Sequence, residues 1–125
     1  MSVLKVIAEE MDALSINYDF EEWKGEPIFP YFTGEYMEVE PLNEEGEQET
    51  QFILNGFARG ISAHADLEEA KNKIKKHFPA IGGRLATTES SRVAIFYANT
   101  LGNLPTGDAE LKRIQINLKV KEWSE

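Results

Sequence analysis

The chain contains two histidines, His64 and His77, the residue type that most often acts as a general base near neutral pH. Ser62, His64 and Asp66 alternate along the chain and carry the three side-chain types of a hydrolytic triad. A triad depends on geometry, however, and three residues within one loop and helix start rarely adopt it. Asp66 followed by Glu69 is instead the pattern of a capping box at a helix N-terminus. The spacing favours a structural role, so we expect no catalytic residues and no enzymatic activity.

No arrangement of ligand residues predicts a metal or a cofactor. His64 and Asp66 have no further histidine nearby, and the absence of cysteine removes thiolate zinc sites. The glutamates of residues 42–50 do not follow the twelve-residue calcium-loop pattern. Residues 82–84 (Gly-Gly-Arg) lack the glycine spacing and the lysine–hydroxyl pair of a phosphate loop. We therefore expect no cofactor, and we place His77 on the surface or beside the C-terminal dipole of a helix.

Charge is distributed unevenly along the sequence. Residues 1–50 carry fourteen acidic side chains against two lysines, whereas residues 51–125 carry eight acidic against eleven basic side chains. A net charge of −9 disfavours binding along a DNA backbone, because that binding is driven by lysine and arginine displacing counterions. The asymmetry favours a solvated acidic surface that maintains solubility. Head-to-tail docking of copies through opposite charges is the alternative.

Length and composition are those of one ordinary globular domain. The chain has 125 residues, of which 42% are hydrophobic and 28% charged, so it is long enough to bury a core. No apolar run approaches the length that spans a bilayer, and no secretory signal is visible. Without cysteine there is no disulfide framework. We expect a single domain over residues 1–125 and synthesis in the cytoplasm, without membrane association.

The clearest structural signal is the alternation within residues 111–123. Ile114, Ile116, Leu118 and Val120 alternate with polar residues, which predicts a strand with one apolar face and one wet face. Such a strand belongs to an antiparallel sheet that is covered on one side only.

Two amphipathic stripes supply the cover. Val3, Ile7 and Met11 repeat at helical spacing, as do Leu67, Ala70 and Ile74. The expected elements are helices over residues 3–14 and 66–78 and strands over residues 16–20, 31–39, 51–59, 85–87, 93–98 and 111–123. Residues 42–50, 88–91 and 99–108 are expected as connections. The resulting fold class is α+β, with a mainly antiparallel sheet of about four to five strands and the two helices packed on one face.

Four stretches carry a resemblance to a known family. They are Glu22-Trp23, residues 30–36 (PYFTGEY), residues 52–56 (FILNG) and, above all, residues 105–118 (PTGDAELKRIQINL). Together they resemble the tail terminator, or head-to-tail joining (tail completion), proteins of long-tailed phages and of prophages in Gram-positive bacteria. The similarity covers nearly the whole chain as a succession of elements.

The resemblance implies a non-enzymatic virion component. Subunits of that family form a ring, commonly a hexamer, that caps the completed tail tube, stops its growth and meets the head connector. The expected partners are therefore further copies, the tail tube and the connector, with no sequence-specific nucleic acid. The alternative is a small protein-binding or regulatory module that uses the exposed sheet face.

Seven charged residues are candidates for subunit or tube contacts. The acidic ones lie in or beside the 42–50 connection, and the basic ones lie on the polar face of the last strand: Glu44, Glu45, Glu47, Glu49, Arg113, Lys119 and Lys121. The lysines and the arginine either meet glutamates of a neighbouring copy or are simply solvated, and the sequence leaves both open. Around a ring, the glutamates would also repel DNA phosphates and let a genome pass.

Overall fold

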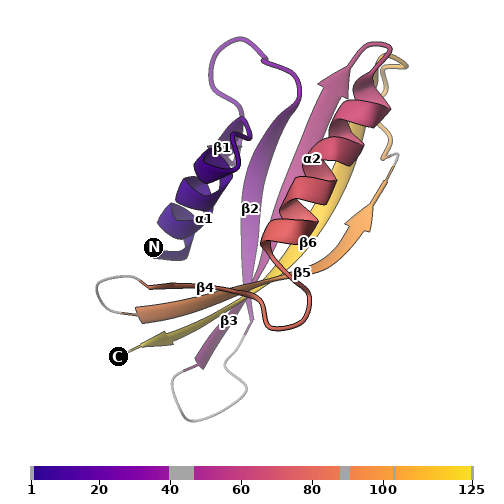
Figure 1. Ribbon diagram of the computed structural model, residues 1–125. Coiled ribbons are helices and arrows are strands. Elements are labelled where there is room, and N and C mark those ends of the chain that lie inside the picture. The colour runs from indigo at the N-terminus through magenta and orange to yellow at the C-terminus, as the bar shows by residue number, and fades with distance from the viewer. Residues whose placement is uncertain (1, 40–46, 88–90, 103, 125) are drawn as a thin grey trace.

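A computed structural model describes residues 2–39, 47–87, 91–102 and 104–124 of the chain. Two helices and six strands are present (Figure 1). In chain order they are α1 (Ser2–Ala13), β1 (Tyr18–Phe20), β2 (Tyr31–Val39), β3 (Glu47–Arg59), α2 (Ala63–His77), β4 (Arg84–Thr87), β5 (Ser91–Leu101) and β6 (Leu111–Ser124). The predicted α+β class is confirmed.

All six strands form one sheet in the order β1-β2-β3-β6-β5-β4. The expectation of four to five strands is wrong, because the short segments β1 and β4 both join the sheet as its edges. β1 pairs parallel to β2, and the other four pairings are antiparallel. The sheet is therefore mixed, and the strand nearest the end of the described chain, β6, lies at its centre.

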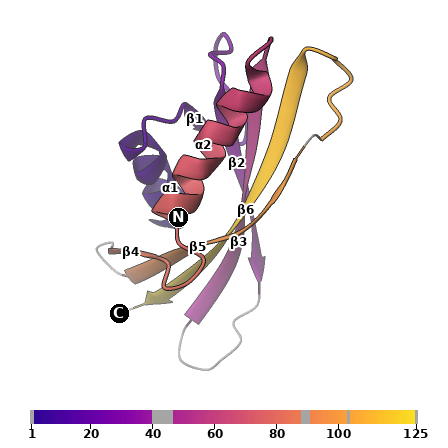
Figure 2. The same ribbon diagram turned by 45° about the vertical axis from the view of Figure 1, so that its right-hand side comes forward.

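Both helices lie on the same side of the sheet, as Figures 1 and 2 show. The alternation of residues 111–123 is confirmed, since Ile114, Ile116, Leu118 and Val120 all point into the core beneath the helices. The predicted helical stripes supply the other half of that core, through Val3, Ile7, Met11, Leu67, Ala70 and Ile74. Burial of these side chains, at roughly 25 cal/mol per Å² of apolar area, is the main force holding helices and sheet together.

Strand pairing extends two predicted boundaries. β3 begins at Glu47 rather than at residue 51, because Glu49 and its neighbours continue the ladder with the end of β6. Likewise β5 continues to Leu101 instead of ending at residue 98, with a register shift between Tyr97 and Asn99 that absorbs one extra residue. Neither extension alternates in hydrophobicity, so the cause is the partner strand and not the local sequence.

The predicted capping box is wrong by one turn. α2 begins at Ala63 with Ser62 at the N-cap position, so Asp66 lies inside the first turn. The Ser62 hydroxyl donates to the Asp66 carboxylate over 3.0 Å, and the Asp66 N–H donates to the Ser62 carbonyl over 2.8 Å. The acidic side chain is still favourable there, because it faces the positive end of the helix dipole.

Two glycines allow aromatic rings to lie against the sheet. Gly56 stands opposite Phe32 in the β2–β3 ladder, and a Cβ at Gly56 would overlap the Phe32 ring. β2 also continues without a break through Gly34. A Cβ at Gly34 would overlap the Tyr18 hydroxyl and the Phe52 ring, so the position serves packing and not chain reversal.

Candidate interaction surface

The face of the sheet opposite the helices has no cover from any element that the structure describes. We call it the open face. The residues on it used below, from β2, β3, β5 and β6, are Tyr31, Thr33, Glu35, Glu49, Asn55, Phe57, Asn99, Arg113, Gln115, Asn117, Lys119 and Lys121. Three of its polar side chains are nonetheless buried, with Thr33, Asn55 and Asn117 each 8% exposed. The surface is therefore packed and hydrogen-bonded without a covering layer.

Four aromatic rings, which we call the aromatic ladder, run along one end of this face. The Tyr31 ring lies 5.1 Å from that of Trp23, 5.4 Å from that of Phe29 and 5.1 Å from that of Phe57, measured between centroids. The Arg113 guanidinium lies over the Phe57 ring at 5.9 Å. Tyrosine, tryptophan and arginine are the side chains enriched at the centres of protein–protein interfaces. The ladder thus has the composition of a protein contact site, and contacts within the chain hold its rings in place.

A hydrogen-bond chain crosses the centre of the open face. Asn55 donates to the Glu35 carboxylate over 3.2 Å and accepts from the Arg113 guanidinium over 2.9 Å. The Nε atom of Arg113 is buried and has no hydrogen-bond partner among the described residues. Next to it, Gln115 donates to Asn117 over 3.1 Å. These hydrogen bonds fix the orientation of Arg113, whose charge stays partly desolvated and is linked through Asn55 to the Glu35 carboxylate.

The structure brings together three of the seven predicted contact residues within one chain. Lys119 lies 3.3 Å from the Glu49 carboxylate, and Lys121 stands opposite Glu49 in the ladder. Glu47 belongs to β3, opposite Trp123 in register. Glu44 and Glu45 lie outside the described residues, so the predicted role of that acidic segment remains a prediction.

Residues 105–111 begin the stretch 105–118 on which the resemblance mainly rests, and side-chain hydrogen bonds hold them in a turn. The Asp108 carboxylate accepts from the Glu110 N–H over 3.0 Å and from the Arg59 guanidinium over 2.8 Å. The bond from the Glu110 N–H, and after it the bond from Arg59, stabilise the carboxylate and so lower the pKa of Asp108 below its ordinary value. Thr106 donates to the Leu111 carbonyl over 2.9 Å, and Gly107 has a φ of +79°, which suits glycine. The turn therefore delivers β6 to the centre of the sheet.

His64 is exposed on the first turn of α2, where Ser62 bonds to Asp66 and not to the imidazole. A triad is absent from this segment. Within the described part of the chain, no group of three or more histidine, aspartate or glutamate side chains is placed to hold a metal ion. No helix among the described residues is long and apolar enough to cross a membrane.

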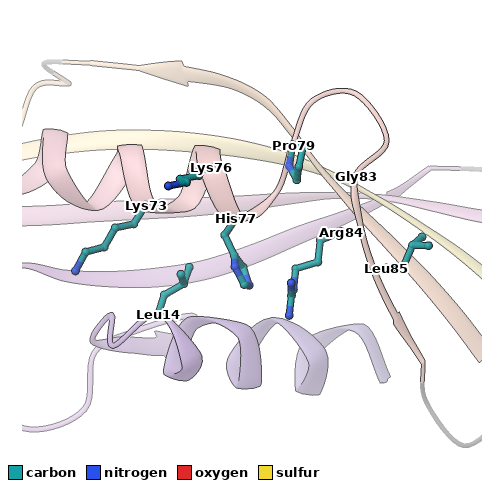
Figure 3. A pocket seen from close by; sticks show the side chains of 8 residues that line it. All are labelled: Leu14, Lys73, Lys76, His77, Pro79, Gly83, Arg84 and Leu85. Atoms are coloured by element: carbon teal, nitrogen blue, oxygen red, sulfur yellow. The ribbon is translucent and has the colours of Figure 1, made fainter.

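His77 lies in the last turn of α2, beside the helix C-terminus as predicted, and it also contacts a carboxylate of α1 that the sequence did not indicate. Its Nε2 atom lies 2.5 Å from a Glu10 carboxylate oxygen, and the Arg84 Nε atom lies 2.8 Å from the same oxygen. Figure 3 shows both side chains pointing from α2 and β4 toward α1. Glu10 occupies the position three residues after Ile7, at the edge of the buried stripe, which is the one local signal that it faces the protein.

A cleft of about 710 Å³ opens beside this cluster. Its walls are basic and apolar: Lys73, Lys76 and Arg84 supply positive charge, His77 supplies an imidazole ring, and Leu14, Pro79 and Leu85 are the apolar lining residues (Figure 3). The structure thus presents two surfaces that could meet another molecule, the open face of the sheet and this cleft on the helical side.

Comparison with known proteins assigns neither surface to a family. No protein-family model matches the chain, and no curated protein matches it.

Proposed function

We propose that this chain is a non-enzymatic structural protein of a phage or prophage virion, which assembles as a ring at the end of the tail tube. In this role it terminates tail growth and joins the tail to the head. The observation that carries the proposal is the ordered but uncovered face of the sheet, where an aromatic ladder and an oriented arginine are prepared for protein contact. The resemblance of Glu22-Trp23 and of residues 30–36, 52–56 and 105–118 to tail terminator proteins supplies the kind of assembly.

Preorganisation supports an assembly role because it lowers the cost of association. Ordering a flexible side chain at an interface costs about 0.5–1.5 kcal/mol. On the open face, Asn55, Arg113 and Tyr31 are already held by neighbours within the subunit. A contact made there therefore loses less of its interaction energy to the ordering of side chains. In a closed ring this gain repeats at every identical contact.

Tube termination tests the proposal directly. Purified protein is added to tail-tube subunits that polymerise in solution, and tube lengths are measured by electron microscopy. We expect added protein to stop elongation and to appear as a ring at one tube end. Tubes that elongate unchanged in the presence of excess protein would contradict the proposal and leave the protein-binding module as the better hypothesis.

Reversing one charge on the open face tests whether this face is needed for tube termination. Lys119 is 49% exposed, so Lys119→Glu changes the charge of the face with little effect on the core. We expect this variant to lose termination activity on the order of tenfold, since like charges at an interface oppose docking. Lys5→Glu makes the same charge change on the exposed side of α1 and is expected to keep wild-type activity.

A further inference from the structure

The cleft between α1, α2 and β4 gathers positive charge in a chain whose net charge is −9. Lys73, Lys76, His77 and Arg84 line it, and Glu10 is the carboxylate that contacts this group. Glu10 is itself occupied by His77 and Arg84. No carboxylate of the described residues forms an ion pair with Lys73 or Lys76, and both lysines are exposed. The cleft therefore keeps an uncompensated positive field.

Because apolar side chains lie beside the lysines, a bare inorganic anion is a poor match for the cleft. Leu85 is 76% exposed at its edge, and Ile81, in the connection between α2 and β4, is 93% exposed. Exposed apolar side chains of this size beside lysines match a polypeptide that carries acidic and apolar residues together. A free phosphate would satisfy the lysines and leave these side chains in water.

The chain itself contains such a polypeptide in the connection between β1 and β2. Glu21, Glu22 and Glu26 are exposed there, together with Ile28, which is 59% exposed. The Trp23 indole donates to the Glu26 carbonyl over 2.9 Å, which holds the segment in a compact turn. We call residues 21–28 the acidic turn.

The two features form no ion pair with each other among the described residues of one chain. In both ribbon views the acidic turn lies beyond β1 and the start of β2, away from the end of α2 and the start of β4 (Figures 1 and 2). The cleft extends from that end of α2 to Leu14 and Lys73, and Lys73 also lines a second pocket with Asn17 and Pro30. Because these opposite charges are left unpaired within the chain, they are available to pair between copies, and that pairing is heterologous, head to tail.

We propose that the cleft binds the acidic turn of a neighbouring copy. Lys73 and Lys76 then pair with Glu22 and Glu26, and Ile28 covers the apolar edge at Leu85. Glu10 has a positioning role, because it holds Arg84 and His77 against α1 and so keeps the cleft open between the helices. This inference rests on the proposed function in that the contact would repeat around the ring, but the contact itself is independent of any tail tube.

Zero-length crosslinking of isotopically mixed subunits tests the contact. Unlabelled and ¹⁵N-labelled protein are mixed, treated with a carbodiimide and digested for mass spectrometry. We expect links of Lys73 or Lys76 to Glu21, Glu22 or Glu26 in peptides of mixed isotope composition, weakening as salt screens the charges. If wild-type protein yields no mixed links between these residues, in whatever oligomeric state it adopts, the proposal is overturned.

A charge swap gives a second and more specific test. We expect Lys73→Glu/Lys76→Glu to weaken self-association on the order of tenfold or more, and Glu22→Lys/Glu26→Lys to do the same. Mixing the two variants should restore association, because each acidic cleft then meets a basic turn and each basic cleft an acidic one. Lys5→Glu/Lys75→Glu makes the same charge change outside the cleft and serves as the matched control. Unchanged association of either swapped variant, or no rescue on mixing, would overturn the proposal.

These outcomes separate the two proposals. A cleft variant that still forms rings and stops tube growth shows that the contact is wrong while the function stands. Mixed links and charge-swap rescue without any effect on tube length show that the contact is right while the function is wrong.

Discussion

The two faces of β6 are built from alternate residues of one fourteen-residue strand, yet they are held in different ways. On the covered face, Ile116 and Leu118 are fully buried against the helices. On the open face, Asn117 is almost as buried, but by hydrogen bonds to Gln115 and Asn99 and by its flanking strands. Apolar area stabilises the first face, and satisfied polar groups keep the second face ordered. Burial alone therefore does not distinguish the core from the open face in this protein.

Truncating neighbouring residues on the two faces tests whether the faces contribute differently to the free energy of unfolding. We expect Leu118→Ala to lower the free energy of unfolding by about 2–5 kcal/mol, because it leaves a cavity under the helices. Lys119→Ala, one residue further on, should change it by less than about 0.5 kcal/mol. Urea unfolding monitored by circular dichroism measures both. Similar losses in the two variants would mean that the faces are not distinct in energy.

Gly56→Ala tests how tightly the covered face is packed. The added Cβ would overlap the fully buried Phe32 ring, so we expect destabilisation of about 1–3 kcal/mol by overpacking. Gly102→Ala is the matched control, since a Cβ there meets nothing within 4 Å. Equal midpoints of thermal unfolding for the two variants would contradict the close approach.

Asn55→Ala tests whether hydrogen bonds order the open face. It removes the bridge between Glu35 and Arg113, and we expect a loss of about 1.5 kcal/mol in unfolding free energy. Exchange-broadened or shifted NMR signals of the Arg113 side chain would show that its orientation depends on Asn55. A variant with unchanged stability and Arg113 signals would remove the argument for preorganisation.

The smallest expected effect concerns a polar group on the covered face. The Tyr18 hydroxyl is buried and has no hydrogen-bond partner among the described residues. We expect Tyr18→Phe to raise the free energy of unfolding by about 1 kcal/mol near neutral pH, since an unsatisfied polar group is removed. A destabilised Tyr18→Phe protein would indicate that the hydroxyl has a partner.

Alkaline pH sharpens the Tyr18 test. Burial, reinforced by the charge of Asp19, raises the pKa of Tyr18 above the ordinary value of about 10. The folded state thus holds the phenol proton more tightly than the unfolded state, so stability is retained below pH 10 and lost as the pH rises above it. The advantage of Tyr18→Phe should grow above pH 10, whereas Tyr36→Phe, at an exposed tyrosine, should show no such growth.

Local periodicity predicted the elements that carry their own signal. The alternation of residues 111–123 gave both the strand and its buried side, and the stripes of Val3, Ile7 and Met11 gave α1. Residues 47–50 were missed because Glu-Gln-Glu-Thr has no strand pattern and extends only by pairing with the end of β6. The first turn of α2 was missed because Asp66 and Glu69 imitate a cap one turn too late.

The candidate surfaces were predictable to different degrees. Alternation placed Arg113 and Lys119 on a face away from the helices, although their partners Asn55 and Glu49 come from strand register, which the sequence does not display. The cleft could not be predicted, because Glu10 and His77 lie on different helices that meet only through the packing of the sheet beneath them. Contacts between residues so far apart in the sequence produce no periodic pattern from which they could be predicted.

The central position of β6 has a consequence for how the protein is made. Its ladder partners in β3 and β5 precede it, so a nascent chain that ends before residue 111 holds two half-sheets with nothing between them. Those halves expose the unpaired edges of β3 and β5, which are templates for aggregation. The sheet can therefore be completed only after β6 has been synthesised, and the edges of β3 and β5 stay unpaired until then.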